Sequence, residues 1–346
     1  MAESTRNLTP PAPLSSEERG ESRGGVAPLA VERSCSGLPP LLGGEGGGGG
    51  EVSPDAEPLA PPPPGVWKRL LSNPLAAGSL AILTFIVLCA LFAPVIAPQG
   101  FAAQDLKHRL EPPSAAHWFG TDDLGRDTLS RLIYGARISL SVAVSVELFV
   151  VGIGLTVGLI AGYRGGWLDT LLMRITDVML AFPDVLLAIL LLGTLGTAAS
   201  SPAASMTLVI VALGVTGWPP LARLVRGQVL SLRKREFVEA ARSLGATDGR
   251  IILKHILPNL LSPILVAITV DAAGVILAEA SLSFLGIGVQ RPFPSWGRMI
   301  NDALDYYRSK PNLLVYPSVL LSVTVLALNF LGDGLRDALD PRSRKR

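Results

Sequence analysis

Residues 78–98 read GSLAILTFIVLCALFAPVIAP and contain no charged side chain. An α-helix rises about 1.5 Å per residue, so this stretch reaches roughly 30 Å, the thickness of a bilayer's hydrocarbon core. Trp67, Lys68 and Arg69 precede it, and aromatic and basic residues of this kind mark the membrane interface. The stretch therefore predicts a helix that crosses a membrane.

The composition of the whole chain agrees with this prediction. Hydrophobic residues make up 49% of the 346 residues and charged residues 17%, and the mean hydropathy is +0.44. A soluble chain of this length needs more polar surface to cover its core. The net charge of +2 gives no overall field that would attract nucleic acid, and Cys35 and Cys89 alone make neither a disulfide framework nor a metal site.

Five further apolar stretches follow the first, at residues 138–162, 169–192, 204–225, 259–280 and 314–332. Six spans place both termini on the same side of the membrane. With the amino terminus inside, about 16 Lys and Arg residues fall in the inside segments and about nine in the longer outside loops. We therefore expect an all-α membrane protein with six transmembrane helices and both termini in the cytoplasm.

The chain divides by composition into three parts. Residues 1–65 are of low complexity, with a glycine run at 46–50 and a proline run at 61–64. Such a segment cannot bury enough apolar surface to offset its ordering entropy, so it predicts a disordered cytoplasmic extension, unless the start codon is assigned too early. We expect the first transmembrane helix and an extracytoplasmic loop over 66–137, and the core transmembrane domain over 138–342.

The segment between the fourth and fifth spans carries the strongest functional signal. An apolar stripe at the helical spacing i, i+3, i+4 and i+7 is formed by Phe237, Ala240, Ala241 and Leu244. Gly245 suits the left-handed residue that ends a helix, and Thr247 or Asp248 can cap a second helix that runs into Leu257 and Pro258. The pattern predicts two short cytoplasmic helices that meet at a glycine.

Two interpretations of this elbow are open. A basic amphipathic helix can rest on anionic lipid headgroups. Alternatively, the stripe can anchor the helix in a groove of another protein. Ala240 and Ala241 lie at the centre of the stripe and bury little area in lipid, but they permit another backbone to approach closely. The alanine pair favours docking on a protein.

The same residues resemble a motif of the permease subunits of ATP-binding-cassette importers. Glu239-Ala240-Ala241, three residues, Gly245 and then Leu257-Pro258 are similar to the EAA motif, E-A-A-x3-G-x9-I-x-L-P, with His255 in the place of its isoleucine. The resemblance implies that the elbow docks on the ATPase subunit. The implied coupling residues are Phe237, Glu239, Ala240, Ala241, Leu244, Gly245, Leu257 and Pro258.

Other segments resemble one branch of that family, the second permease subunit of dipeptide, oligopeptide and nickel importers. They are residues 120–127, 134–140, 278–286 and 331–341, and the whole resemblance covers about residues 67–342. It implies a multi-pass protein of the bacterial inner membrane, surrounded by lipid, that imports peptides, with nickel or glutathione as alternatives. The implied partners are a homologous permease, two ATP-binding subunits, and an extracytoplasmic binding protein that docks on loops 99–137 and 286–313.

Acidic residues inside the spans are candidates for a translocation path. A charge at the bilayer centre costs about 2.5–3.5 kcal/mol on insertion scales, so such a residue usually faces a cavity or a partner. Asp271 and Glu279 are eight residues apart, about 80° on a helix, and with Glu147 they are the predicted path residues. Hydrogen bonding between helices is the alternative, and for Asp177 and Asp184 a position near the interface is favoured.

Three other functions are disfavoured by the sequence. An ion-coupled secondary transporter could use the membrane carboxylates, but it has no need of a docking elbow. An intramembrane protease needs catalytic residues in its spans, whereas His108, His117 and His255 fall in predicted loops. The chain contains no Gly-Lys dipeptide and hence no phosphate-binding loop, so we expect ATP to be bound by partner subunits and no cofactor in this chain.

Overall fold

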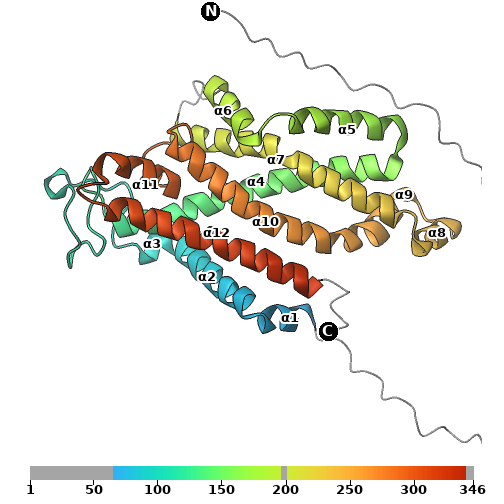
Figure 1. Cartoon of the computed structure of the whole chain (residues 1–346), viewed down its shortest axis with the longest axis horizontal. Coiled ribbons are helices and arrows are strands. Elements are labelled where there is room, and N and C mark those ends of the chain that lie inside the picture. Colours follow the sequence, from blue (N-terminus) through green and yellow to red (C-terminus); the bar gives the residue numbers. More distant parts are fainter. Residues whose placement is uncertain (1–64, 196–200, 340–346) are drawn as a thin grey trace, which may run out of the picture. The chain divides into compact units, whose positions relative to one another are not determined.

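The computed structural model describes residues 65–195 and 201–339. Residues 1–64 of the predicted extension (1–65) and the last residues of the 331–341 segment lie outside the described residues. Within the described ranges the chain is a bundle of helices, and its β structure is limited to an isolated bridge between Thr121 and Asp127 (Figure 1).

The α-helices follow one another as α1 (Val66–Ser72), α2 (Pro74–Leu91), α3 (Ala93–Ile96), α4 (Thr128–Arg164), α5 (Gly166–Leu180), α6 (Asp184–Leu195), α7 (Pro202–Leu232), α8 (Glu236–Ser243), α9 (Asp248–Ile251), α10 (Leu257–Phe284), α11 (Trp296–Ala303) and α12 (Asn312–Leu339). Helix α2 begins where Asn73 accepts hydrogen bonds from two backbone N–H groups and proline occupies the first turn, where its missing donor has no consequence.

Five helices of the described chain are long and apolar enough to cross a membrane: α2, α4, α7, the continuous helix Asp248–Phe284 and α12. The third predicted span, residues 169–192, differs from expectation because it consists of α5 and α6, which are bent by 82°. Pro183 lies at the break. Proline offers no backbone N–H and disfavours helical geometry in the residue before it, which explains why the helix is interrupted here. The described chain has a sixth span only if α5 and α6 together are regarded as a single bent span.

Close packing of α4 on α7 forms the centre of the bundle. Gly154, Gly158 and Gly162 face α7, and a Cβ added at Gly158 would lie 2.6 Å from the Cβ of Val225. Small residues at this spacing let two backbones approach closely in lipid. Gly152, on the same helix, has no described atom within 4 Å of an added Cβ and takes no part in this contact.

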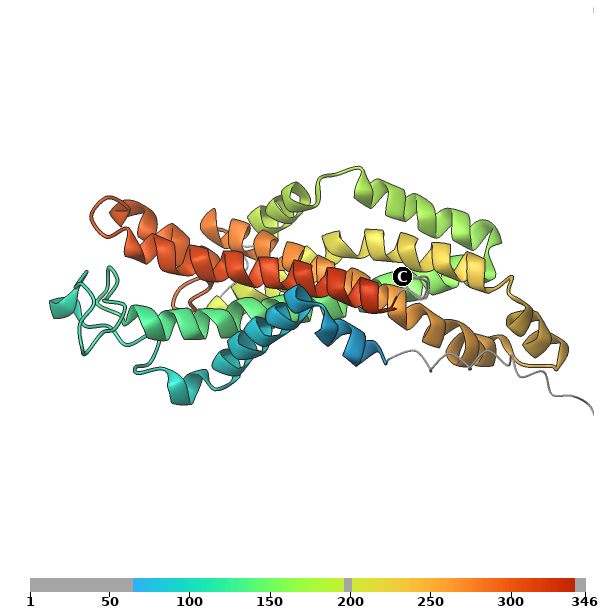
Figure 2. The ribbon, with the colours of Figure 1, turned by 60° about the horizontal axis from the view of Figure 1, so that its bottom comes forward.

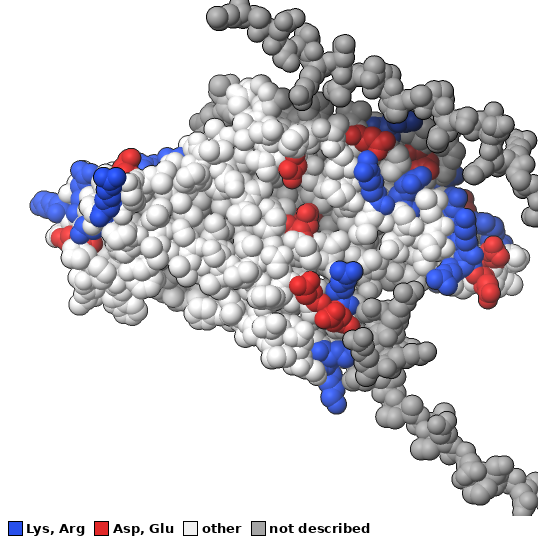
Figure 3. All heavy atoms as spheres, viewed as in Figure 1, with Lys and Arg blue, Asp and Glu red and all other residues white. Residues whose placement is uncertain are grey.

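The two ends of the bundle carry different elements. The short helix α8 lies at one end, and α11 lies with the loop of residues 97–127 at the other (Figures 1 and 2). Lys, Arg, Asp and Glu side chains gather at these ends, whereas the middle of the face in Figure 3 is almost uncharged. This distribution is the one expected of a bundle whose middle lies in hydrocarbon.

Candidate functional site

Helix α8 rests on the bundle through one side of its surface. Val238 is fully buried in the main core cluster, and Ala241 packs against the same cluster. Phe237 and Leu244, at the two ends of the predicted stripe, are 42% and 88% exposed, and Ala240 and Glu239 are exposed as well. The stripe is therefore largely an outward surface, and the buried anchor is Val238, which the stripe pattern did not single out.

Gly245 ends α8 in the way the sequence predicts. Its φ of +78° is in the left-handed region, which a residue with a Cβ adopts only with strain. The N–H of Ala246 then donates to the carbonyl of Ala241 at 3.1 Å, which closes the helix end. No described atom lies within 4 Å of an added Cβ, so the backbone conformation, and not lack of space, requires glycine here.

The second arm of the elbow differs from the predicted short helix. Helix α9 continues through a π-helical turn, Ile252–Ile256, directly into α10, so Leu257 and Pro258 lie inside one helix that extends from Asp248 to Phe284. The wider π turn accommodates Pro258, whose ring would clash with the carbonyl four residues earlier in a regular helix. Three fully buried side chains hold this arm to the bundle: Ile251, Ile256 and Leu260.

His255, at the position of the motif's isoleucine, contacts the elbow itself. Its ring centroid lies 6.4 Å from that of Phe237. The contact joins the first and second arms of the elbow across the turn at Gly245. The His255 ring therefore lies between the two arms of the elbow.

Polar contacts tie the elbow to the end of α4. The Tyr163 hydroxyl donates to Asp248 at 2.6 Å, and Arg233 Nη1 donates to the carbonyls of Gly162 and Tyr163 at 3.0 and 3.2 Å. These are carbonyls that the last turn of a helix leaves without a partner. A hydrogen bond with Tyr163 also holds the pKa of Arg242 above its ordinary value.

A cavity of about 460 Å³ lies among α4, α7 and α10, and two of the predicted path residues line it. Glu147 of α4 is 7% exposed, and neither of its carboxylate oxygens has a hydrogen-bond partner among the described residues. Asp271 of α10 lines the same cavity and, with Asp184 of α6, a neighbouring one of about 240 Å³. Acidic side chains are visible in the otherwise uncharged middle of Figure 3.

Glu279 lies apart from this cavity. It is fully buried and accepts hydrogen bonds from the hydroxyls of Ser139 at 3.1 Å and Ser283 at 2.7 Å. The hydroxyl of Ser283 accepts in turn from the Val289 N–H, and that of Ser139 from the Trp296 N–H. Glu279 thus lies in the last part of α10 and takes part in the interhelical hydrogen bonding that was the alternative to a path.

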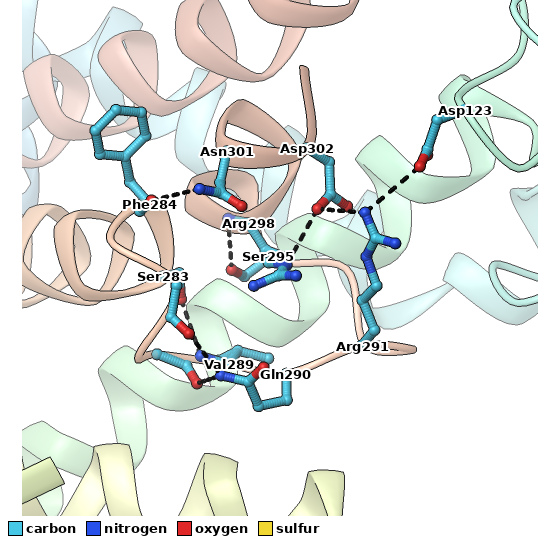
Figure 4. A network of polar contacts seen from close by, with 12 residues as sticks. Asp123, Ser283, Phe284, Val289, Gln290, Arg291, Ser295, Arg298, Asn301 and Asp302 are labelled. Carbon is cyan, nitrogen blue, oxygen red and sulfur yellow. Dashed lines mark hydrogen bonds and ion pairs between the residues drawn. The ribbon is translucent and has the colours of Figure 1, made fainter. Parts of the chain in front are cut away.

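The end of the bundle opposite α8 is closed by a charge network (Figure 4). Arg291 donates to Asp302 at 2.8 Å and lies 3.5 Å from Asp123, while Arg298 lies 3.1 Å from Asp302. The pairing with Asp302 raises the pKa of Arg291. Arg126, nearly fully buried, binds Asp122 within its own segment at 2.7 Å and lies 3.8 Å from Asp302, and this second contact links the segment 120–127 to α11.

In the sequence, the segment 120–127 stood out only by its family resemblance. The signal that could have shown more is its cluster of mixed charges, Asp122, Asp123, Arg126 and Asp127. Of the residues that the structure describes, no three His, Cys, Asp or Glu side chains form a group that could hold a metal ion.

Comparison with known proteins now adds to this geometry. Residues 154–345 match the family described as "binding-protein-dependent transport system inner membrane component". Residues 65–113 match the "N-terminal TM domain of oligopeptide transport permease C".

Relatives are similar over most of their length. The dipeptide transport system permease protein DppC of Alkalihalophilus pseudofirmus is 43% identical over 83% of this chain and 96% of that protein. The oligopeptide permease OppC of Bacillus subtilis is 42% identical over 84% and 94%. The glutathione permease GsiD of Pectobacterium atrosepticum is 42% identical over 80% and 90%.

A solved structure of the MetNI methionine ABC transporter in inward-facing conformations shares the fold, with a TM-score of 0.51 and 22% identity over 61% of this chain and 98% of that one. The apolar spans, the elbow and these matches agree over the described bundle. The chain belongs to the family of binding-protein-dependent transport system inner membrane components, as a multi-pass protein of the bacterial inner membrane.

Proposed function

We propose that this chain is one of two permease subunits of an ATP-binding-cassette importer of peptides. Two separate ATPase subunits bind the ATP, an extracytoplasmic binding protein delivers the substrate, and both termini of this chain are cytoplasmic. The proposal of peptides is supported by the names of the dipeptide and oligopeptide relatives. Glutathione is the second candidate because relatives named for its transport are equally similar, and nickel is the third.

The observation that carries this proposal is the outward surface of α8. A helix that rested on headgroups would present basic residues beside a wide apolar face. Instead, Phe237 and Leu244 flank the small residue Ala240, and all three are exposed in the single chain. This spacing of large anchors around a small centre suits a groove of another protein.

The continuity of the second arm supplies a route for coupling. Movement of α8 reaches α10 through the turn at Gly245 and reaches α4 through Tyr163 and Arg233. Helices α4 and α10 are two of the three that line the cavity with Glu147 and Asp271. Closure of the ATPases would therefore act on the walls of the proposed path as a nearly rigid lever.

The test is the variant Gly245→Val, with Gly249→Ala as the matched control. A β-branched residue is strained at φ of +78°, so the first variant misplaces α8, whereas Gly249 lies within a helix with open space around an added Cβ. We expect Gly245→Val to insert normally, to lose co-purification of the ATPase and to abolish uptake. The control should retain all three.

Uptake at the parental rate by Gly245→Val would contradict the coupling role. Purification of the parental chain as a homo-oligomer without an ATPase would contradict the importer assignment itself. That result would favour an ion-coupled transporter that uses the membrane carboxylates.

A further inference from the structure

We infer that the cavity among α4, α7 and α10 is a subsite for the ammonium group of a peptide in transit, held by Glu147 and Asp271. The inference rests on the proposed function and deepens it. It concerns the substrate's charged amino terminus and not the side chains by which peptides differ.

Glu147 is a buried carboxylate that no donor group of the described chain neutralises. Its side chain is more than nine-tenths buried and lines the cavity, neither carboxylate oxygen accepts from a donor group in the described part of the chain, and the carboxyl group of Asp271 lies close beside it. A buried carboxylate without a partner is costly, and the cost is offset only when a positive or hydrogen-bond-donating group reaches it. Glu279 shows that this fold can satisfy a buried glutamate with serine hydroxyls where the role is structural.

The composition of the cavity wall supports the same inference. Apart from Glu147 and Asp271, the described lining residues are apolar or glycine and proline, and none is Lys, Arg or His. Two carboxylates from different helices therefore face one space without a counter-charge from this chain. In a low-dielectric surrounding such a pair attracts a cation strongly.

The size of the cavity selects among cations. About 460 Å³ falls within the range of roughly 300–1,000 Å³ that small-molecule sites occupy, and a proton needs no such volume. A divalent metal ion prefers six or more oxygen ligands, whereas no three acidic, His or Cys side chains group together in the described chain. An ammonium group on a larger molecule fits both the charge and the space.

Every peptide with a free amino terminus carries such an ammonium group. The α-amino group has an ordinary pKa of about 7.7–8.0, so it is largely protonated at neutral pH whatever the side chains are. A subsite for it would serve many peptides equally. The neighbouring cavity shares Asp271 and adds Asp184, which offers the cation a next carboxylate along the bundle.

The principal experiment measures ATP-driven uptake into proteoliposomes that contain the complete transporter, with the binding protein saturated with a free tripeptide. Glu147→Gln and Asp271→Asn together remove both charges and keep the side-chain shapes. Asp333→Asn, at an exposed position on α12 away from the cavity, is the matched control. We expect the double variant to lose about tenfold or more of its uptake rate, the usual scale for charge-assisted contacts, with ATPase stimulation retained.

A second measurement reports the charge of the cavity without requiring transport. Leu224, which lines the cavity, is replaced by cysteine in a chain whose two native cysteines are serine. With Glu147 and Asp271 present, a cationic methanethiosulfonate should react at least several-fold faster than an anionic one, and neutralising both carboxylates should remove the difference. A free tripeptide should slow the labelling, and its N-acetylated form should not.

The outcomes separate the inference from the proposed function. Undiminished uptake in the double variant, absence of a cationic preference in the labelling of Leu224→Cys, or equal protection by the acetylated peptide would each overturn the subsite. If the double variant does not assemble, the labelling measurements decide alone. If the parental transporter shows no ATP-driven peptide uptake, the proposed function fails, whereas the cationic preference still tests the charge of the cavity.

Discussion

Glu147 and Glu279 are both glutamates inside long apolar helices, but their side chains meet opposite surroundings. Glu279 receives two serine hydroxyls and, through them, two backbone N–H groups near the turn between α10 and α11. Glu147 lines a cavity with no partner for either oxygen among the described residues. The contrast shows that an intramembrane carboxylate has no fixed role, because the hydrogen-bond donors around it decide whether it fastens helices or faces a substrate.

The largest effect should come from Glu279→Ala. It leaves buried serines without their acceptor and opens a space at the junction of α4, α10 and α11, so we expect a loss of about 3 kcal/mol or more. Thermal unfolding of the purified complex measures it. Glu279→Gln keeps an acceptor and should lose clearly less. Equal stability of Glu279→Ala and the parental protein would remove the structural half of the contrast.

A smaller effect is expected where α4 meets α7 beside the cavity. Gly158→Val drives a side chain into Val225, an overpacking that costs about 1–3 kcal/mol, and it displaces a helix that forms the cavity wall. Gly152→Val, on an open side of the same helix, is the control and should change stability little. A similar loss in both variants would mean that α4 tolerates no β-branched residue, and packing on α7 would not be the cause.

Glu147→Gln should change stability least of these variants, and the sign of its effect should be opposite to that of the Glu279 variants. Removal of an unpartnered buried charge should leave the unfolding free energy unchanged or raise it by about 1 kcal/mol. The same thermal unfolding measurement compares it directly with Glu279→Gln. Marked destabilisation by Glu147→Gln would show that Glu147 fastens helices as Glu279 does, and the contrast would disappear.

A further small effect is expected at the elbow. Tyr163→Phe removes only the hydroxyl that donates to Asp248, so we expect a loss of about 0.5–1.5 kcal/mol. Because this contact joins α4 to the second arm, uptake per ATP hydrolysed should fall although the ATPase still binds. An unchanged ratio of uptake to hydrolysis would place the coupling entirely in the continuous helix from α9 to α10.

The sequence by itself determined the positions of five spans, of helix α8 and of the glycine that ends it. Hydropathy over about twenty residues is a local property, and the left-handed conformation at Gly245 follows from the absence of a Cβ, so neither depends on distant neighbours. The expected side of the termini rests on Lys and Arg counts and stays a prediction. The coupling role implied by the family motif also stays a prediction. Of the residues that the motif implies, Phe237, Glu239 and Leu244 are exposed in the single chain.

Only the tertiary structure decided which side chains meet. The angle of about 80° between Asp271 and Glu279 on the helix could not show that Asp271 lines the cavity whereas α11 packs near Glu279. The residues around each carboxylate come from segments far away in the chain. For the same reason only the structure showed that Val238 is the buried anchor of α8 and that the predicted span 169–192 is bent by 82°. The helical period of the sequence determines which residues share one face of a helix, whereas tertiary packing determines what that face contacts.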